Sequence, residues 1–164
     1  MSSPWEEVRL ETARLRLRPP VSEDAQAVAE LVTDQEVMRY LGDVVPEDQV
    51  GEVVEKWRAR WEQNSMGPFV IERREDGRFV GRAGIVVWDT RTWTIATFDD
   101  AGTYAQPELG WALARAQWGN GYATESAHAV RAWVRRERGV DRLVSVIALD
   151  NLRSQAVAQQ LHRQ

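Results

Sequence analysis

The alternation of hydrophobic and polar residues predicts that the fold begins with a strand followed by two helices. Arg14-Leu-Arg-Leu-Arg18 alternates apolar with charged residues and ends at two prolines, which is typical of a half-buried strand. Ser22 is suited to cap a first helix, because the apolar residues after it follow a 3.6-residue period. Residues 46–64 form a clearer amphipathic helix, whose apolar stripe consists of Val50, Val53, Val54, Trp57 and Trp61.

The middle of the chain changes to short apolar runs separated by turn residues, which predicts a meander of strands. Strands are expected from residue 69 and over 79–88, 91–98 and 103–113, with turns at 75–77 and 99–102. The last third alternates again between the two kinds of element. We expect a helix after residue 121 that ends near Gly139, a buried strand at Leu143–Ala148, and a final helix from Asp150-Asn151 to about Leu161.

This order of elements predicts an α/β (α+β) fold in a single domain over residues 1–164. Its central sheet is expected to be mixed and mostly antiparallel, with helices on its faces. One parallel pair of strands should lie across the helix that follows residue 121, because parallel strands need a crossover connection of this kind.

Between the strand and this helix lies the most informative segment, Trp118-Gly-Asn-Gly-Tyr-Ala-Thr-Glu125. Free N–H groups and the positive dipole end at the first turn of a helix favour a phosphate group, and Gly119 and Gly121 have no Cβ to block it. The segment matches neither a P-loop nor the dinucleotide fingerprint, whose third glycine would fall at Thr124. An ordinary strand-to-helix turn remains the alternative.

Composition and charge exclude several functional classes. The 164 residues include no cysteine and only two histidines, so the sequence offers neither a thiolate nucleophile nor a recognised metal-ligand spacing. A net charge of −4, with both signs spread along the chain, argues against direct nucleic-acid binding and favours an amine-bearing substrate. The sequence lacks a membrane-spanning apolar run and a signal pattern, from which we expect a cytoplasmic protein that does not bind membranes.

Five segments in register resemble the GNAT N-acetyltransferases, and within them the RimJ/RimL-like branch that acetylates the N-termini of ribosomal proteins. The resemblance covers nearly the whole chain. It rests on residues 10–18, on Asp34–Leu41, on Glu108–Leu113, on the glycine segment, and on Asn151–Ser154.

The resemblance implies a site for acetyl-coenzyme A and no metal. The family's signature, Gln/Arg-x-x-Gly-x-Gly/Ala, falls on Trp118, Gly121 and Ala123, with tryptophan at the first position. The N–H groups of residues 119–124 are implied to hold the pyrophosphate, and the pantetheine to lie between two splayed strands. The implied cofactor-binding residues are Trp111, Ala112, Leu113, Trp118, Gly119, Asn120, Gly121, Tyr122, Ala123, Thr124, Asn151 and Ser154.

Two residues are catalytic candidates for transfer of an acetyl group to a primary amine. Glu108, on the strand that leads to the glycine segment, is the candidate general base, although a strand carboxylate can also be only a salt-bridge partner. The resemblance implies that Ser154 lies near the thioester sulfur as a proton donor. Asn151 is implied to lie near the pantetheine, and it is also a good N-cap for the last helix.

Alternatives for the acceptor remain open: a protein N-terminal amine, a small amine such as an antibiotic or polyamine, or a coenzyme A-binding module without turnover. Members of the family usually continue after the last helix with one or two more strands beside the segment Leu143–Ala148. Here these C-terminal strands are absent from the sequence, so we expect an exposed sheet edge that a homodimer would cover.

Overall fold

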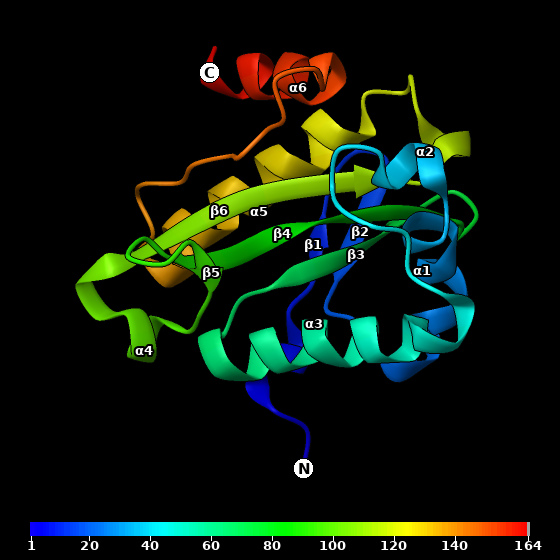
Figure 1. Ribbon diagram of the computed structural model, residues 1–164. Coiled ribbons are helices and arrows are strands. Elements are labelled where there is room, and N and C mark those ends of the chain that lie inside the picture. Colours follow the sequence, from blue (N-terminus) through cyan, green and yellow to red (C-terminus); the bar gives the residue numbers. More distant parts are fainter. Residues whose placement is uncertain (164) are drawn as a thin grey trace.

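The computed structural model describes residues 1–163, so Gln164, the last residue of the expected domain, lies outside the described residues. A twisted sheet forms its centre, and helices cover both faces (Figure 1). The strands are β1 (Leu10–Glu11), β2 (Leu15–Arg18), β3 (Pro68–Arg73), β4 (Phe79–Asp89), β5 (Thr94–Ile95) and β6 (Ala105–Leu113). The α-helices are α1 (Ala25–Val32), α2 (Gln35–Met38), α3 (Val50–Asn64), α4 (Phe98–Ala101), α5 (Tyr122–Arg138) and α6 (Leu152–His162).

The strands follow the order β1-β2-β3-β4, and every pair of named strands is antiparallel. Both β6 and the short β5 pair with β4. The long ladder of β4 and β6 runs from Gly81 opposite Leu113 to Asp89 opposite Ala105, and it forms the backbone on which the site is built. The expected mixed α/β fold with a mostly antiparallel sheet is therefore confirmed.

Alternation along the strands creates two cores, one on each face of the sheet. Helices α1 and α3 cover one face, where Val54 and Trp57 pack with Val70 of β3 and Ala112 of β6. Helix α5 covers the other face with its apolar stripe. The residues of that stripe are Ala127, Val130, Trp133 and Val134, which are buried against β2, β4 and β6.

The helices predicted after Ser22 and over residues 46–64 are present as α1 and α3, but both differ from the prediction at their N-terminal ends. Helix α3 begins at Val50 after a turn of 3₁₀-helix at Glu47–Gln49. Ser22 does not cap α1, because its hydroxyl donates to Glu55 and the carboxylate of Asp24 instead accepts from the N–H of Val21. Gly139 ends α5 in the left-handed conformation, with φ of 65°, as expected for a C-cap.

The prediction of a strand over 91–98 and a turn over 99–102 is wrong. Only Thr94–Ile95 forms a strand, and Phe98–Ala101 is the helix α4. The hydroxyl of Thr97 accepts from the N–H of Asp100 (3.0 Å), so Thr97 acts as an N-cap with two aspartates in the first helical turn. This capping pattern in the sequence outweighs the β propensity of the preceding residues.

The strand predicted at Leu143–Ala148 is also wrong, because only Val144 pairs with the sheet, as a parallel bridge to Glu108. The N–H of Leu109 donates to the carbonyl of Val144 (2.9 Å). Beyond Val144, hydrogen bonds that involve side chains replace the backbone hydrogen bonds of a regular parallel ladder. The Ser145 hydroxyl donates to the Leu109 carbonyl (2.7 Å), and the N–H of Val146 donates to a carboxylate oxygen of Glu108 (2.6 Å). The parallel pair is thus reduced to one contact, and the two segments separate after it.

The aromatic cluster around Trp61 gives a test of the core. Trp61 is fully buried against Trp5, Phe69 and Trp133, and its indole N–H donates to the carbonyl of Pro68 (2.7 Å). We expect Trp61→Ala to lower the free energy of unfolding by about 3–5 kcal/mol in denaturant titrations, because it leaves a cavity and an unpaired carbonyl. The matched variant Trp93→Ala, at a half-exposed turn position, should change it by less than about 0.5 kcal/mol. Equal losses in the two variants would contradict this description of the core.

Candidate functional site

The glycine segment connects the end of β6 to the start of α5 through a tight turn. Gly119 and Gly121 both adopt the left-handed conformation, with φ of 81° and 80°. A residue with a Cβ is strained there, which explains why glycine occupies both positions. No atom lies within 4 Å of the place that a Cβ on Gly119 would occupy, so the turn is open on this side.

The backbone N–H groups of residues 119–124 are free within the part of the chain that the structure describes. None of them donates to another described residue, and the helical ladder begins only with the N–H of Glu125, which donates to the carbonyl of Gly121 (3.1 Å). Such a row of donors at the positive end of a 17-residue helix is suited to bind an anion. The expected anion site therefore has the necessary free donors.

Trp118 holds this turn in place. Its indole N–H donates to the carbonyl of Leu113 (2.9 Å), which ties the turn to the end of β6. The guanidinium of Arg153, at the start of α6, lies over its ring at 3.5 Å from the centroid. Trp118 thus brings the end of β6, the glycine turn and α6 together, and it places a cation beside the free N–H groups.

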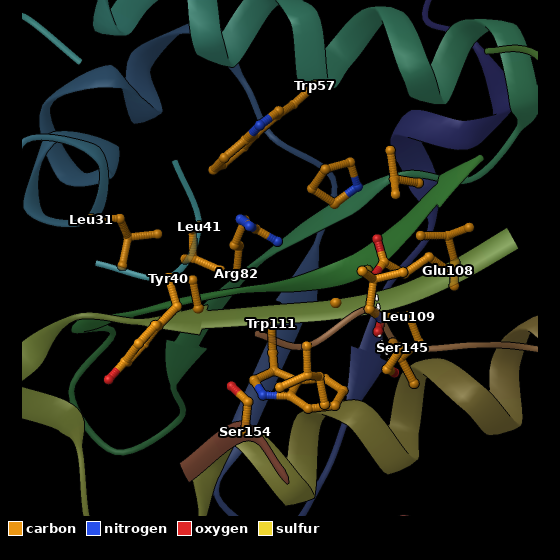
Figure 2. Close-up of a pocket in the computed structure, with 18 of the residues that line it drawn as sticks. Leu31, Tyr40, Leu41, Trp57, Arg82, Glu108, Leu109, Trp111, Ser145 and Ser154 are labelled. Atoms are coloured by element: carbon orange, nitrogen blue, oxygen red, sulfur yellow. Dashed lines mark hydrogen bonds between the residues drawn. The ribbon is translucent and has the colours of Figure 1, made fainter. Parts of the chain in front are cut away.

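Two adjoining cavities form the site. The smaller, of about 240 Å³, lies beside the glycine turn, and the larger, of about 450 Å³, lies between the sheet and helices α1 and α3. They share a junction, defined here as the residues that border both: Tyr40, Leu41, Trp111, Ala112, Asn151 and Ser154. Figure 2 shows Tyr40, Trp111 and Ser154 near one another in the close-up of the larger cavity.

The structure brings together nearly all residues that were expected to bind the cofactor. Asn120 does not border the smaller cavity, and its side-chain amide donates to the carbonyl of Gln117 (3.0 Å), although its backbone N–H is one of the free donors of the turn. The others border that cavity: Trp111, Ala112, Leu113, Trp118, Gly119, Gly121, Tyr122, Ala123, Thr124, Asn151 and Ser154.

The edge of β6 at the junction has free backbone groups. Since the N–H of Leu109 points toward Val144, the N–H and carbonyl of Trp111, two residues further on, point to the same side. No described residue forms a hydrogen bond with them there, because the chain beyond Val144 has separated from β6. Buried backbone groups of this kind require a partner, and an extended ligand could provide one.

Glu108 lies in the larger cavity, buried to 9% exposure, and both carboxylate oxygens already accept one hydrogen bond. Oε1 accepts from the indole N–H of Trp88 (2.9 Å), and Oε2 accepts from the N–H of Val146 (2.6 Å). These two donors fix the orientation of the carboxylate, and each oxygen keeps a lone pair for a further donor. Figure 2 shows Glu108 and Ser154 at different parts of the cavity lining.

Asn151 and Ser154 lie at the start of α6, as the spacing of three residues suggested. The Asn151 side chain accepts from the N–H of Ser154 (3.2 Å), which confirms the capping role of Asn151. The hydroxyl of Ser154 forms no hydrogen bond with any described residue and borders both cavities. It is therefore free to interact with a ligand at the junction.

Sequence reasoning missed several residues that border the site. Tyr40 and Leu41 lie within the segment Asp34–Leu41, which was noticed in the sequence without a role. Arg82 interrupts an otherwise apolar strand, and this was an unused signal. Arg60, on the polar side of α3, had no distinguishing signal in the sequence.

An ion pair links the segment Asp34–Leu41 to the chain just before the glycine turn. Asp34 caps α2 by accepting from the N–H groups of Glu36 (2.9 Å) and Val37 (3.3 Å). The same carboxylate pairs with Arg115 (2.6 Å), which lies just before the turn. Hydrogen bonding to the Arg115 guanidinium lowers the pKa of Asp34 below its ordinary value, so the pair stays charged at neutral pH.

Other carboxylates near the sheet have separate roles. Asp89 binds Arg91 (2.6 Å), and this hydrogen bond lowers the pKa of Asp89. Asp99 and Asp100 lie in the first turn of α4 and are exposed. These three aspartates are not among the described residues that border either cavity. Within residues 1–163, no group of three or more histidine, aspartate or glutamate side chains is arranged to hold a metal ion.

Comparison with known proteins agrees with this geometry. The model of the acetyltransferase (GNAT) domain matches residues 14–164. The Bacillus subtilis protein YkkB is 30% identical over 155 residues, which cover 93% of this chain and 83% of YkkB. None of the helices in residues 1–163 is both long and apolar enough to cross a membrane.

Solved structures share the fold. An acetyltransferase from Agrobacterium tumefaciens superimposes with a TM-score of 0.76 at 27% identity, covering 98% of this chain and 84% of that protein. RimL, a ribosomal alpha-N-protein acetyltransferase in complex with coenzyme A, superimposes with a TM-score of 0.76 at 17% identity, covering 94% and 83% of the two chains. At that identity the likeness to RimL concerns the fold alone. The chain belongs to the GNAT acetyltransferase family.

Proposed function

We propose that this chain transfers the acetyl group of acetyl-coenzyme A to a primary amine, within one domain over residues 1–164. The observation that carries the proposal is the junction of the two cavities at Trp111, Ala112 and Ser154. One cavity has free N–H donors for an anion, and the other holds an oriented carboxylate. Two substrates bound in them would meet at the junction, and such alignment supplies much of the acceleration in a transfer reaction.

Coenzyme A fits the residues of the smaller cavity. Its pyrophosphate would accept from the N–H groups of residues 119–124, and Arg153 is close enough to the turn to add a positive charge. Its pantetheine amides would pair with the N–H and carbonyl of Trp111, in the manner of an added strand. When bound, the acetylated cofactor supplies a thioester that an amine can attack. RimL, which has the same fold, has been solved in complex with coenzyme A, and this supports the proposal by analogy.

Glu108 is the proposed general base on the acceptor side. An ammonium group must lose a proton before the nitrogen can attack a carbonyl carbon, and Glu108 is the only acidic residue among the described residues that border the larger cavity. Trp88 and Val146 hold the carboxylate in one orientation, so that an amine or a bridging water can reach a free lone pair.

Ser154 is the proposed proton donor for the departing thiolate. Its hydroxyl borders both cavities and is not engaged by any described residue, so it would lie where the two substrates are proposed to meet. Tyr40 borders the same junction with a phenolic hydroxyl, so it is the second candidate for this role. The variants Ser154→Ala and Tyr40→Phe separate the two candidates.

The acceptor is proposed to be a primary amine, with a protein N-terminus as one instance. The RimL enzyme, a ribosomal alpha-N-protein acetyltransferase, shares the fold and supports this instance by analogy only. A larger cavity of about 450 Å³ is also compatible with a small amine, and turnover of a panel of peptides and small amines would decide between them.

The glycine turn gives the first test of this proposal. Gly119→Ala should weaken the binding of coenzyme A by roughly tenfold or more in calorimetry, since the methyl group strains the turn and enters the space for the pyrophosphate. Gly139→Ala is the matched control, because Gly139 has a similar positive φ of 65°, is equally open and lies at the opposite end of α5 from the turn. We expect the control to lower stability similarly while leaving the affinity unchanged. Unchanged affinity in Gly119→Ala would contradict the assignment.

The catalytic carboxylate gives the second test. Glu108→Gln should lower kcat by about 10²- to 10⁴-fold in a thiol-release assay, because the amide cannot accept a proton, while the affinity for coenzyme A stays close to that of the wild type. Ser154→Ala should lower kcat by a smaller factor. The control Glu137→Gln, at the exposed end of α5, should have no effect.

An amide oxygen at position 108 can replace only one of the two acceptor oxygens, so some loss of stability is also expected in Glu108→Gln. Unfolding curves of the variant must therefore accompany the kinetics. A fall in cofactor affinity equal to the fall in kcat would assign Glu108 to structure rather than to catalysis.

A further inference from the structure

Two arginines without a partner border the acceptor cavity, and the proposed chemistry leaves them unused. Arg60 comes from α3 and Arg82 from β4, and both are half-buried. Within residues 1–163 neither guanidinium forms an ion pair or donates a hydrogen bond. The third described arginine that borders one of the two cavities is Arg153. It lies over the Trp118 ring beside the glycine turn, away from Arg60 and Arg82.

The surroundings of Arg82 make an unpaired cation unfavourable. Burial lowers its pKa to about 10, and the positive charge of Arg60 contributes to this, while Glu108 opposes it. Burial also lowers the pKa of Arg60. Both groups still carry their charge at neutral pH. The two positive charges on the cavity lining are therefore close enough to repel each other, and a bound anion would reduce this repulsion.

No described carboxylate forms an ion pair with either guanidinium. Glu108, the only carboxylate among the described residues on the cavity lining, attracts Arg82 but lies beyond ion-pair distance, and its two oxygens accept from Trp88 and Val146. The contact of Arg82 with the ring of Trp57, at 5.9 Å from the centroid, lies at the limit of a cation–π interaction and satisfies none of the N–H donors. Figure 2 shows the guanidinium of Arg82 directed toward Trp57, away from the strand that carries it.

We propose that Arg60 and Arg82 form an anion subsite that binds a carboxylate of the acceptor, so that the acetylated molecule carries both a primary amine and an acidic group. This proposal rests on the proposed acetyl transfer, because it places the amine of the same molecule at Glu108. A guanidinium presents a planar set of donors that matches a carboxylate, and two of them make the subsite selective for charge.

The register of the sheet sets the spacing between the two groups. Glu108 lies opposite Val86 on β4, and Arg82 is four residues from Val86 on the same face of the strand. The α-carbons of Glu108 and Arg82 are therefore about 13 Å apart along the strand direction and about 14 Å apart in space, a span that the two side chains shorten. The subsite therefore favours an acceptor whose carboxylate is several bonds from its amine, such as an acidic N-terminal residue or an ω-amino acid, over a simple α-amino acid.

A matched pair of acceptors tests the subsite. For the wild type we expect kcat/KM for 6-aminohexanoic acid to exceed that for 6-aminohexanamide, which has the same length and no charge. Arg82→Gln and Arg60→Gln should each lower kcat/KM for the acid by about 10- to 100-fold, the effect of losing one charged hydrogen bond, and should leave the amide nearly unaffected. Arg82→Lys should keep part of the preference because it keeps the charge.

The control Arg135→Gln changes an exposed arginine on α5, at the opposite face of the sheet. It should leave kcat/KM unchanged for both the acid and the amide. Equal kcat/KM for the acid and the amide in the wild type, with no change in the arginine variants, would overturn the subsite while leaving the acetyltransferase function intact. Two arginines are tested separately, so that loss of folding in one variant does not decide the result.

Binding without turnover separates this proposal from the proposed function. N-acetyl-6-aminohexanoate, which cannot react further, should bind to the protein saturated with coenzyme A more tightly than its amide does, and Arg82→Gln should remove the difference in calorimetry. If no amine is acetylated but this difference is present, the subsite stands and the transfer reaction is wrong. If neither compound shows a preference that depends on Arg60 or Arg82, the subsite is wrong.

Discussion

The separation of one chain segment from β6 is the constraint on which the site depends. Among the described residues, a single parallel bridge, Val144 to Glu108, is the only backbone pairing between residues 143–148 and the sheet, and the backbone groups of Trp111 beyond it have no partner. Leaving such groups unpaired at a buried strand edge is unfavourable unless a ligand completes the pairing. The fold therefore contains an incomplete sheet at the point where its two cavities meet.

Glu108 connects this structural feature to the proposed chemistry. Its carboxylate accepts a hydrogen bond from the N–H of Val146, in place of a backbone carbonyl of a regular parallel ladder. The indole N–H of Trp88 donates to its other oxygen. The same hydrogen bonds that hold the separating segment thus orient the proposed base toward the acceptor cavity. Structure and catalysis are coupled at this residue, and variants at position 108 must be judged by stability as well as by rate.

Sequence reasoning succeeded where the signal was local. Helical periods, the alternation of β2 and the two glycines before α5 predicted most elements and the tight turn with its free N–H groups, because each depends on neighbouring residues. It failed at α4, where the cap at Thr97 was overlooked, and at residues 143–148, where side-chain bonds replace a ladder. Tyr40, Arg60 and Arg82 meet only through tertiary packing of distant elements, which a single sequence does not reveal.

Amide hydrogen exchange measured by NMR, with and without acetyl-coenzyme A, tests the central claim most directly. If the cofactor completes the incomplete sheet, its binding should slow exchange at the N–H groups of residues 119–124 and at that of Trp111, because both sets lack a protein acceptor. The N–H of Leu109, which already donates to Val144, should change little by comparison. Saturating cofactor without protection at Trp111 and the glycine turn would contradict the account.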